Sequence, residues 1–290
     1  MYLYNMYGLK VSSQIKIDEI NELNSISNNE VDIYITLKDE KIDVNETNII
    51  TIDKNNIIVD VKDVARYTVT NGKSIVVELC ENTEEIEIKN YLLGWSFGCI
   101  FVQRKMVPLH ASSVLLNNKA LVIAGHTQAG KSTLSNRLMN KGYNFISDDI
   151  CVIDMDENKT PMVIPSIPVN KIRPDMVEKL GYKLKDKNSR LHIDINDSIV
   201  DRKKEFGTFV YLMQGDVDEV SIEEIRGKDK IDCFLDNVYS IDIEVYFGLE
   251  QGYFKKCLDI VKKIKMYKMT RPIGKFTVDD QIKILEKVCQ

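Results

Sequence analysis

The feature that most constrains this chain is an eight-residue loop with the spacing G-x-x-x-x-G-K-[ST]. It reads Gly-His-Thr-Gln-Ala-Gly-Lys-Ser over residues 125–132. An apolar run at residues 120–124 precedes the loop, and the spacing of apolar residues predicts a helix from Lys131 to about Asn140, ended by Gly142. A glycine loop between a buried strand and a helix indicates an α/β fold built around that strand.

Each residue type in this loop suits the binding of a polyphosphate. Glycines at its two ends have no Cβ, so the chain can curl until consecutive backbone N–H groups face one anion. The helix that follows adds the positive end of its dipole. Lys131 can reach the β- and γ-phosphates, and the Ser132 hydroxyl is placed to bind Mg²⁺, so ATP and Mg²⁺ are the expected cofactors. The predicted nucleotide-binding residues are Gly125, His126, Thr127, Gln128, Ala129, Gly130, Lys131, Ser132 and Thr133.

An acidic pair, Asp148 and Asp149, follows the strand predicted at residues 143–147. A strand–helix–strand unit crosses over right-handedly and sets its two strands parallel in one sheet. The pair therefore lies beside the loop, at the carboxyl edge where open α/β sheets bind ligands. Successive strand residues point to opposite faces, so we expect one carboxylate near Mg²⁺ and the acceptor and the other bracing the loop. Ser132, Asp148 and Asp149 are the candidate metal ligands.

Two classes of nucleotide-dependent protein are excluded by their missing motifs. No LSGGQ-like signature of an ABC-type ATPase is present. The N-K-x-D motif of a GTPase is also missing, because the Asn-Lys pairs at residues 118, 158 and 170 lack the Asp.

Composition bounds the remaining classes. The chain has 290 residues, 44% of them hydrophobic, and a formal net charge of −5 with scattered Lys and Arg, which argues against a nucleic-acid partner. The longest apolar stretch, residues 91–102, is too short to span a bilayer, and the amino terminus has no signal-peptide pattern. Six cysteines without CxxC spacing fit free thiols in a reducing cytoplasm. We expect a cytoplasmic protein without a membrane partner, and a homo-oligomer is compatible with the sequence.

The apolar period divides the chain near Glu85. Before it, short alternating segments predict strands at 2–11, 31–37, 48–52, 57–61, 65–70 and 74–79. After it, residues 84–106 have apolar residues nearly all round, as in a helix packed on two sides. We predict a β-rich scaffold or recognition domain over residues 1–85 and a P-loop catalytic domain over residues 86–290.

The second domain is predicted to alternate strands with helices. Its predicted strands are 109–116, 120–124, 143–147, 151–154, 162–164 and 209–213, and Asn117-Asn118-Lys119 forms a hairpin-like turn between the first two. Its predicted helices are 131–140, 174–180, 252–264 and 278–288.

The segment LHASSVLL…ALVIAGHTQAGKSTLSNRLMNKGYNFISDD resembles the catalytic domain of the HPr kinase/phosphorylase family. That family has a P-loop fold related to phosphoenolpyruvate carboxykinase, a histidine 21 residues before the loop lysine and an Asp-Asp whose second member lies 18 after it. Here these registers fall on His110 and Asp149. The resemblance implies phosphate and Mg²⁺ roles for Lys131 and Ser132, a general base in Asp149 and a supporting catalytic role for His110. The close match spans residues 109–153.

A closer likeness is to the HPr kinase-like group found beside ribosomally made peptides, lasso peptide kinases among them. Members begin with a "Y-G-L" strand, as in Tyr7-Gly8-Leu9, and have "LHAS" before a GKST loop. Thr133 stands where HPr kinases have Glu. The likeness implies an acceptor hydroxyl, usually Ser, on a precursor peptide.

We therefore expect an ATP- and Mg²⁺-dependent kinase that phosphorylates a Ser or Thr hydroxyl of a peptide or protein. Two alternatives stay open: a non-catalytic nucleotide-binding module that presents a peptide, and a kinase of a small molecule such as free serine. Arg190 and Arg271 are candidate phosphate contacts. His126 is expected to offer only its backbone N–H, and His192 is expected to be structural.

Overall fold

The computed structural model describes residues 1–25, 27, 30–167, 169–172, 191–194, 199–239 and 252–289. The chain divides into two compact units. The first holds Met1–Pro108 with Tyr239–Phe254, and the second holds Leu109–Val238 with Lys255–Gln290. Among the described residues, no helix is both long enough and apolar enough to cross a membrane.

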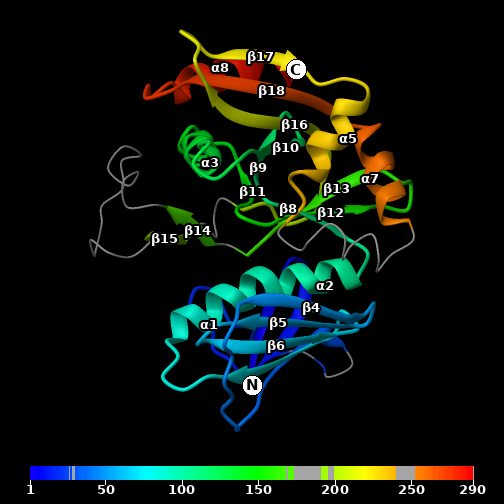
Figure 1. The fold of residues 1–290 in the computed structure, drawn as a ribbon. Helices are drawn as coiled ribbons and strands as arrows, with labels where there is room; N and C mark the ends of the chain where they lie inside the picture. The colour runs from blue at the N-terminus through cyan, green and yellow to red at the C-terminus, as the bar shows by residue number, and fades with distance from the viewer. Residues whose placement is uncertain are drawn as a thin grey trace. The chain divides into compact units, whose positions relative to one another are not determined.

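The first unit is a mixed seven-stranded sheet with a helical segment on one face (Figure 1). The strand order is β1-β2-β3-β7-β6-β5-β4, and β3 runs parallel to β2 and β7 while the other neighbours are antiparallel. The strands are β1 (Tyr2–Met6), β2 (Leu9–Ser13), β3 (Ile33–Leu37), β4 (Asn48–Asp53), β5 (Asn56–Val61), β6 (Ala65–Thr70) and β7 (Ser74–Leu79).

The strand expected over residues 2–11 is a hairpin of β1 and β2. Tyr7 and Gly8 take φ values of 54° and 69°, and two successive positive φ values match the turn to the twist of the paired strands. The same chemistry closes β6 onto β7 at Asn71-Gly72, where the φ values are 55° and 61°.

The helical segment comprises α1 (Glu85–Tyr91), a π-helical turn η2 (Leu92–Ser96) and α2 (Phe97–Gln103). The Tyr67 hydroxyl donates to the Ile88 carbonyl at 3.0 Å, and Gly72 N–H donates to Gln103 Oε1 at 2.6 Å. Because this segment is tied to the first sheet, the division between the compact units lies after it, at Pro108/Leu109, whereas the sequence placed a domain boundary before it.

The second unit is built on a mixed sheet. The chain passes from the first unit to the second within strand β8 (Val107–Leu109), after Pro108. The path β11-β9-β10-β16-β13-β12 is extended by β18 beside β16 and by β17 beside β18. The strands are β9 (Ala111–Leu116), β10 (Lys119–Ala124), β11 (Phe145–Ser147), β12 (Cys151–Met155), β13 (Pro161–Ile164), β16 (Lys204–Gly215), β17 (Ser221–Glu224) and β18 (Lys265–Pro272). A separate antiparallel pair joins β14 (Val169–Ile172) to β15 (Leu191–Asp194).

The strand before the glycine loop, β10, lies inside this sheet, parallel to β16 and antiparallel to β9. β11 runs parallel to β10, as the crossover rule predicts, but β9 lies between them. The reason is local: Asn117 and Asn118, with φ values of 50° and 62°, close β9 onto β10 as a tight hairpin. Because β9 pairs with one edge of β10 and β16 with the other, β11 pairs with β9 instead.

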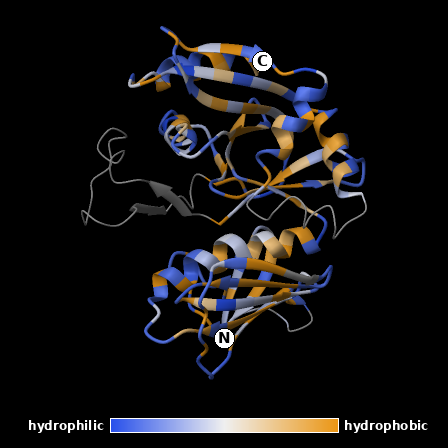
Figure 2. Cartoon of the chain, viewed as in Figure 1, coloured by the Kyte–Doolittle hydropathy of each residue, from blue (hydrophilic) through white to orange (hydrophobic). Residues whose placement is uncertain are grey.

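Helices cover both faces of the second sheet. On one face α3 (Lys131–Asn140) and α8 (Val278–Val288) bury an apolar core with β10, β16 and β18. On the opposite face lies α5 (Lys228–Leu235), whose Phe234 ring centroid is 6.1 Å from that of Phe209. A further helix, α7 (Tyr253–Val261), begins in the first unit and ends in the second. Figure 2 shows hydrophobic residues along the strands and hydrophilic residues concentrated in the connections.

Most predicted elements of the second unit are confirmed, α3 and α8 to the residue. The sequence missed α5, β14, β15, β17 and β18. The helix predicted at residues 174–180 lies outside the described residues.

Candidate functional site

The loop at residues 125–132 is shaped by glycines at its two ends. Gly125 has φ 144°, and a Cβ there would lie 2.2 Å from the Leu212 carbonyl oxygen of β16, so only glycine fits beside this strand. Gly130, with φ 110°, is the N-cap of α3 and supplies no side-chain cap. The first N–H groups of a helix have no partner within it, so they are available to phosphate oxygens.

Lys131 is folded back across the loop. Its side chain is buried, and Nζ donates to the Gly125 carbonyl at 2.8 Å and approaches the His126 carbonyl at 3.5 Å. Burial lowers the pKa of Lys131, and the charges of Asp149 and Asp148 partly oppose that shift. The ammonium is therefore held where a neighbouring anion would favour its charged form.

Asp148 is held by two hydroxyls. Ser112 of β9 donates a short hydrogen bond to its Oδ1, and Ser132 of α3 donates to the same oxygen at 3.2 Å. Burial raises the pKa of Asp148, and the neighbouring Asp149 raises it further, while the serine hydrogen bonds lower it. Asp148 is thus a buried carboxylate whose charged form is supported by hydroxyl groups. A carboxylate next to a hydroxyl suits a hard cation such as Mg²⁺, which prefers oxygen ligands.

Asp149 has its carboxylate beside His110. Its backbone has φ 68°, a conformation uncommon for a residue other than glycine, and its Oδ1 lies 3.5 Å from Nδ1 of His110. Burial lowers the pKa of His110, as does the charge of Lys131, while Asp149 raises it. The sequence predicted that the two carboxylates divide their roles; in the structure Asp148 bonds to two serine hydroxyls, and Asp149 lies beside His110.

The described residues do not by themselves supply a complete set of metal ligands. In the described residues, no group of three or more His, Cys, Asp or Glu side chains is arranged to hold a metal ion. Two carboxylates and the Ser132 hydroxyl leave coordination sites for phosphate and water, which is the usual way in which Mg²⁺ is bound with nucleotides. The residues present therefore fit Mg²⁺ only together with a phosphate ligand.

Arg271, at the end of β18, contacts the glycine loop through its guanidinium group. Its Nε donates to the Ala129 carbonyl at 2.8 Å, and its second terminal nitrogen, Nη2, approaches the Gln128 carbonyl at 3.5 Å. Gln214 donates to the same Gln128 carbonyl at 3.0 Å. Arg271 and Gln214 therefore bind backbone carbonyls of the loop. The sequence had suggested Arg271 as a phosphate contact.

Three other candidates have different outcomes. The ring of His126, expected to contribute only its backbone, lies edge-on to Tyr211 with centroids 6.0 Å apart. His192 lies in β15. Arg190 lies outside the described residues.

The sequence missed Asn237, which follows α5. Its Oδ1 accepts from Gly125 N–H at 3.2 Å, and its backbone carbonyl accepts from His110 N–H at 2.8 Å. One residue thus bridges the start of the loop and the candidate catalytic histidine. No motif marks it, because its partners lie more than 100 residues away in the chain. Ser112 could have been suspected, since it lies two residues after His110.

Comparisons with known proteins add little to this geometry. No protein-family model matches the chain, and no curated protein matches it. Among solved structures, the HPr(Ser) kinase/phosphatase from Coxiella burnetii aligns with a TM-score of 0.35 and 16% identity, over 62% of this chain and 89% of that one. At this level of similarity no role passes from that protein to this one.

Proposed function

We propose that the chain is an ATP- and Mg²⁺-dependent kinase with an HPr kinase-like P-loop core, and that it phosphorylates a Ser or Thr hydroxyl of a peptide or protein. The resemblance noted in the sequence makes a ribosomally made precursor peptide the leading acceptor. The observation that carries the proposal is the convergence of Lys131, Asp148, Asp149 and His110 around one end of the glycine loop.

In the proposed reaction, the acceptor oxygen forms a bond to the γ-phosphorus as the bond to the β,γ-bridging oxygen breaks. ADP leaves with that electron pair, and the hydroxyl proton passes to the Asp149 carboxylate. Lys131 moves from the Gly125 carbonyl to the phosphates, where its charge offsets the charge that develops on them. Ser132 and Asp148 would hold Mg²⁺, which would supply charge neutralisation to the phosphates.

His110 keeps the base available. Because its pKa is lowered, the imidazole is mostly neutral at pH 7, so it does not neutralise the carboxylate 3.5 Å away. Asp149 is then free to accept a proton, and neutral His110 orients it.

The test is phosphopeptide formation from ATP, Mg²⁺ and a mixture of Ser- and Thr-containing peptides, followed by mass spectrometry. Asp149→Asn should reduce the rate by about 100-fold or more, with the affinity for a fluorescent ATP analogue within about threefold of wild type. Asp201→Asn, which removes an exposed carboxylate from the same unit, is the matched control and should match wild type.

Three results would contradict parts of the proposal. Near wild-type turnover by Asp149→Asn would remove the base assignment. ATP binding without ADP formation with any acceptor would support the non-catalytic module. ADP formation with free serine, together with none in the presence of any peptide, would identify the chain as a small-molecule kinase.

A further inference from the structure

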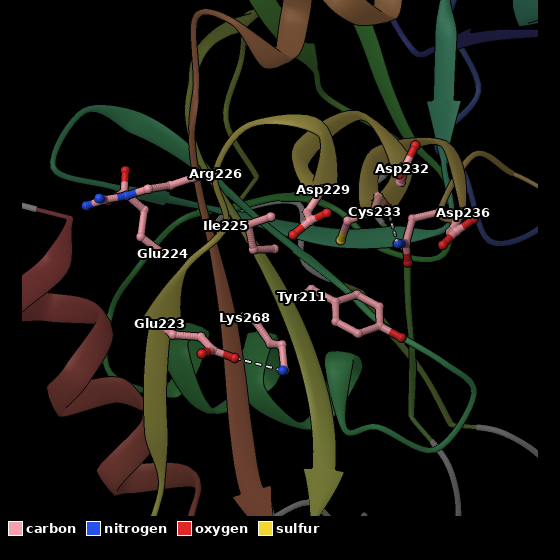
Figure 3. A pocket seen from close by; sticks show the side chains of 11 residues that line it. Tyr211, Glu223, Glu224, Ile225, Arg226, Asp229, Asp232, Cys233, Asp236 and Lys268 are labelled. Carbon is pink, nitrogen blue, oxygen red and sulfur yellow. Dashed lines mark hydrogen bonds and ion pairs between the residues drawn. The ribbon is translucent and has the colours of Figure 1, made fainter.

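A second hollow lies in the same unit, on the α5 face of the sheet. It is an open pocket of about 400 Å³ between β16, β17, β18 and α5 (Figure 3). Its wall on the sheet side is a row of neighbouring side chains from three strands: Tyr211 pairs in register with Lys268, and Lys268 pairs with Glu223. Asp229 of α5 and Asp236, just beyond it, line the other side.

The pocket adjoins the candidate kinase site. Asn237, 6% exposed, lines it and also bonds to Gly125 of the loop and to the backbone of His110. Tyr211, on the sheet wall, meets the ring of His126. Asn237 thus links the pocket to the loop and to the backbone of His110, whose side chain lies 3.5 Å from Asp149.

The charge of the pocket selects its ligand. Five carboxylates and two cationic side chains line it, a net formal charge of −3. Lys268 pairs with Glu223 at 2.7 Å, Arg226 pairs with Glu224, and Lys228 pairs with Asp232 at 3.4 Å. Within the described part of the chain, no cation pairs with Asp229 or Asp236.

This charge repels the phosphates of a nucleotide and attracts a cation. The Tyr211 ring beside the free carboxylates adds a surface on which a guanidinium or ammonium group can lie. A volume of about 400 Å³ exceeds what one long side chain needs, so a side chain can enter together with water.

We propose that this pocket binds a basic side chain, Arg or Lys, of the acceptor peptide, and that it thereby selects acceptors with a basic residue near the phosphorylated hydroxyl. The inference rests on the proposed kinase function. Asp229 and Asp236 are the residues that would bind the cation, and Asn237 separates this subsite from the loop.

The test compares two pools of fluorescein-labelled, Ser-centred peptides. One pool carries a single arginine at varied positions, and the other carries the neutral isostere citrulline at the same positions. Wild type should bind the arginine pool about tenfold more tightly. The double variant Asp229→Asn/Asp236→Asn should bind both pools equally. A double variant of two exposed acids outside the pocket, Asp201→Asn/Asp216→Asn, should keep the wild-type preference.

Equal binding of the two pools by wild type, or an unchanged preference in the pocket variant, would overturn the proposal even if peptides are phosphorylated. If the pocket variant instead loses affinity for the ATP analogue and not for peptides, the pocket holds the nucleoside. If wild type binds no ATP analogue, the proposed kinase function fails, while a preference for arginine that depends on Asp229 and Asp236 would still identify the pocket as a cation site.

Discussion

Ion pairs of the first unit and the charged groups around the glycine loop of the second unit have opposite pKa shifts. In the first unit, the hydrogen bond that Arg66 donates to Asp60 raises the pKa of Arg66, and the hydrogen bond that Lys16 donates to Asp18 lowers the pKa of Asp18, so each charged form is favoured. Around the glycine loop of the second unit, burial lowers the pKa of Lys131 and raises that of Asp148, so each charged form is disfavoured. The first arrangement stabilises the free protein, whereas the second has perturbed pKa values of the kind found at functional sites.

The backbones differ in the same sense. In the first unit, positive φ values at Tyr7 and Asn71 lie in turns that join paired strands. In the second, they also occur at Gly125, Gln128 and Asp149, where they orient the loop and the candidate base. Around the glycine loop, uncommon backbone conformations thus occur beside side chains whose charged forms are disfavoured. This combination is typical of a functional site.

The largest test of this comparison is Lys131→Met. Because it removes the cation that we propose to contact the phosphates, affinity for a fluorescent ATP analogue should fall by about 100-fold or more. Because burial disfavours that charge in the free protein, the thermal midpoint should not fall. Lys141→Met, on an exposed lysine just after α3, is the control. A loss of affinity below threefold would remove Lys131 from the site.

Next in size is Arg271→Lys. Lysine keeps the positive charge but lacks the planar fork that reaches both the Ala129 and Gln128 carbonyls. The loop should lose its outer support, and nucleotide affinity should fall about tenfold. Arg202→Lys, whose side chain is 79% exposed, should behave as wild type. Unchanged affinity in Arg271→Lys would show that the loop holds its shape without the arginine.

A substitution that removes a charge from the first unit should lower the stability of the protein and leave its nucleotide affinity unchanged. Arg66→Met leaves the Asp60 carboxylate, whose side chain is 8% exposed, without its partner. We expect a loss of about 1 kcal/mol in the free energy of unfolding and unchanged nucleotide affinity. Trp95, the only tryptophan, lies in this unit, so its fluorescence during urea unfolding reports the change. A change in nucleotide affinity would contradict the separation of roles.

The smallest effect concerns His110. Its imidazole should titrate below about 6.5 in a histidine NMR titration, and its pKa should rise in Lys131→Met because one cause of the shift is the lysine charge. A His110→Gln spectrum assigns the resonance among the three histidines. The folded-state pKa is depressed, so the unfolded chain binds a proton that the folded chain does not, and stability falls as the pH drops below about 6.5. A His110 pKa that does not move in Lys131→Met would refute the coupling.

Much of the second unit was predictable because its signals are local. The Asn117-Asn118 turn and the glycines around α3 act through φ, which depends on a few adjacent residues. The missed elements had weaker signals: α5 is eight residues of mixed charge, and β17 is four residues with no buried position. Their presence depends on the sheet edge that they cover.

The sequence by itself determined that this chain has a glycine loop between a strand and a helix, with a histidine before it and two carboxylates after it. Only the tertiary structure decided that Ser112 and Ser132 hold one carboxylate, that His110 pairs with the other, and that Asn237 joins the loop to a second pocket. The physical reason is distance along the chain. A loop conformation follows from the residues within it, whereas these contacts follow from the sheet register that brings distant segments to one edge.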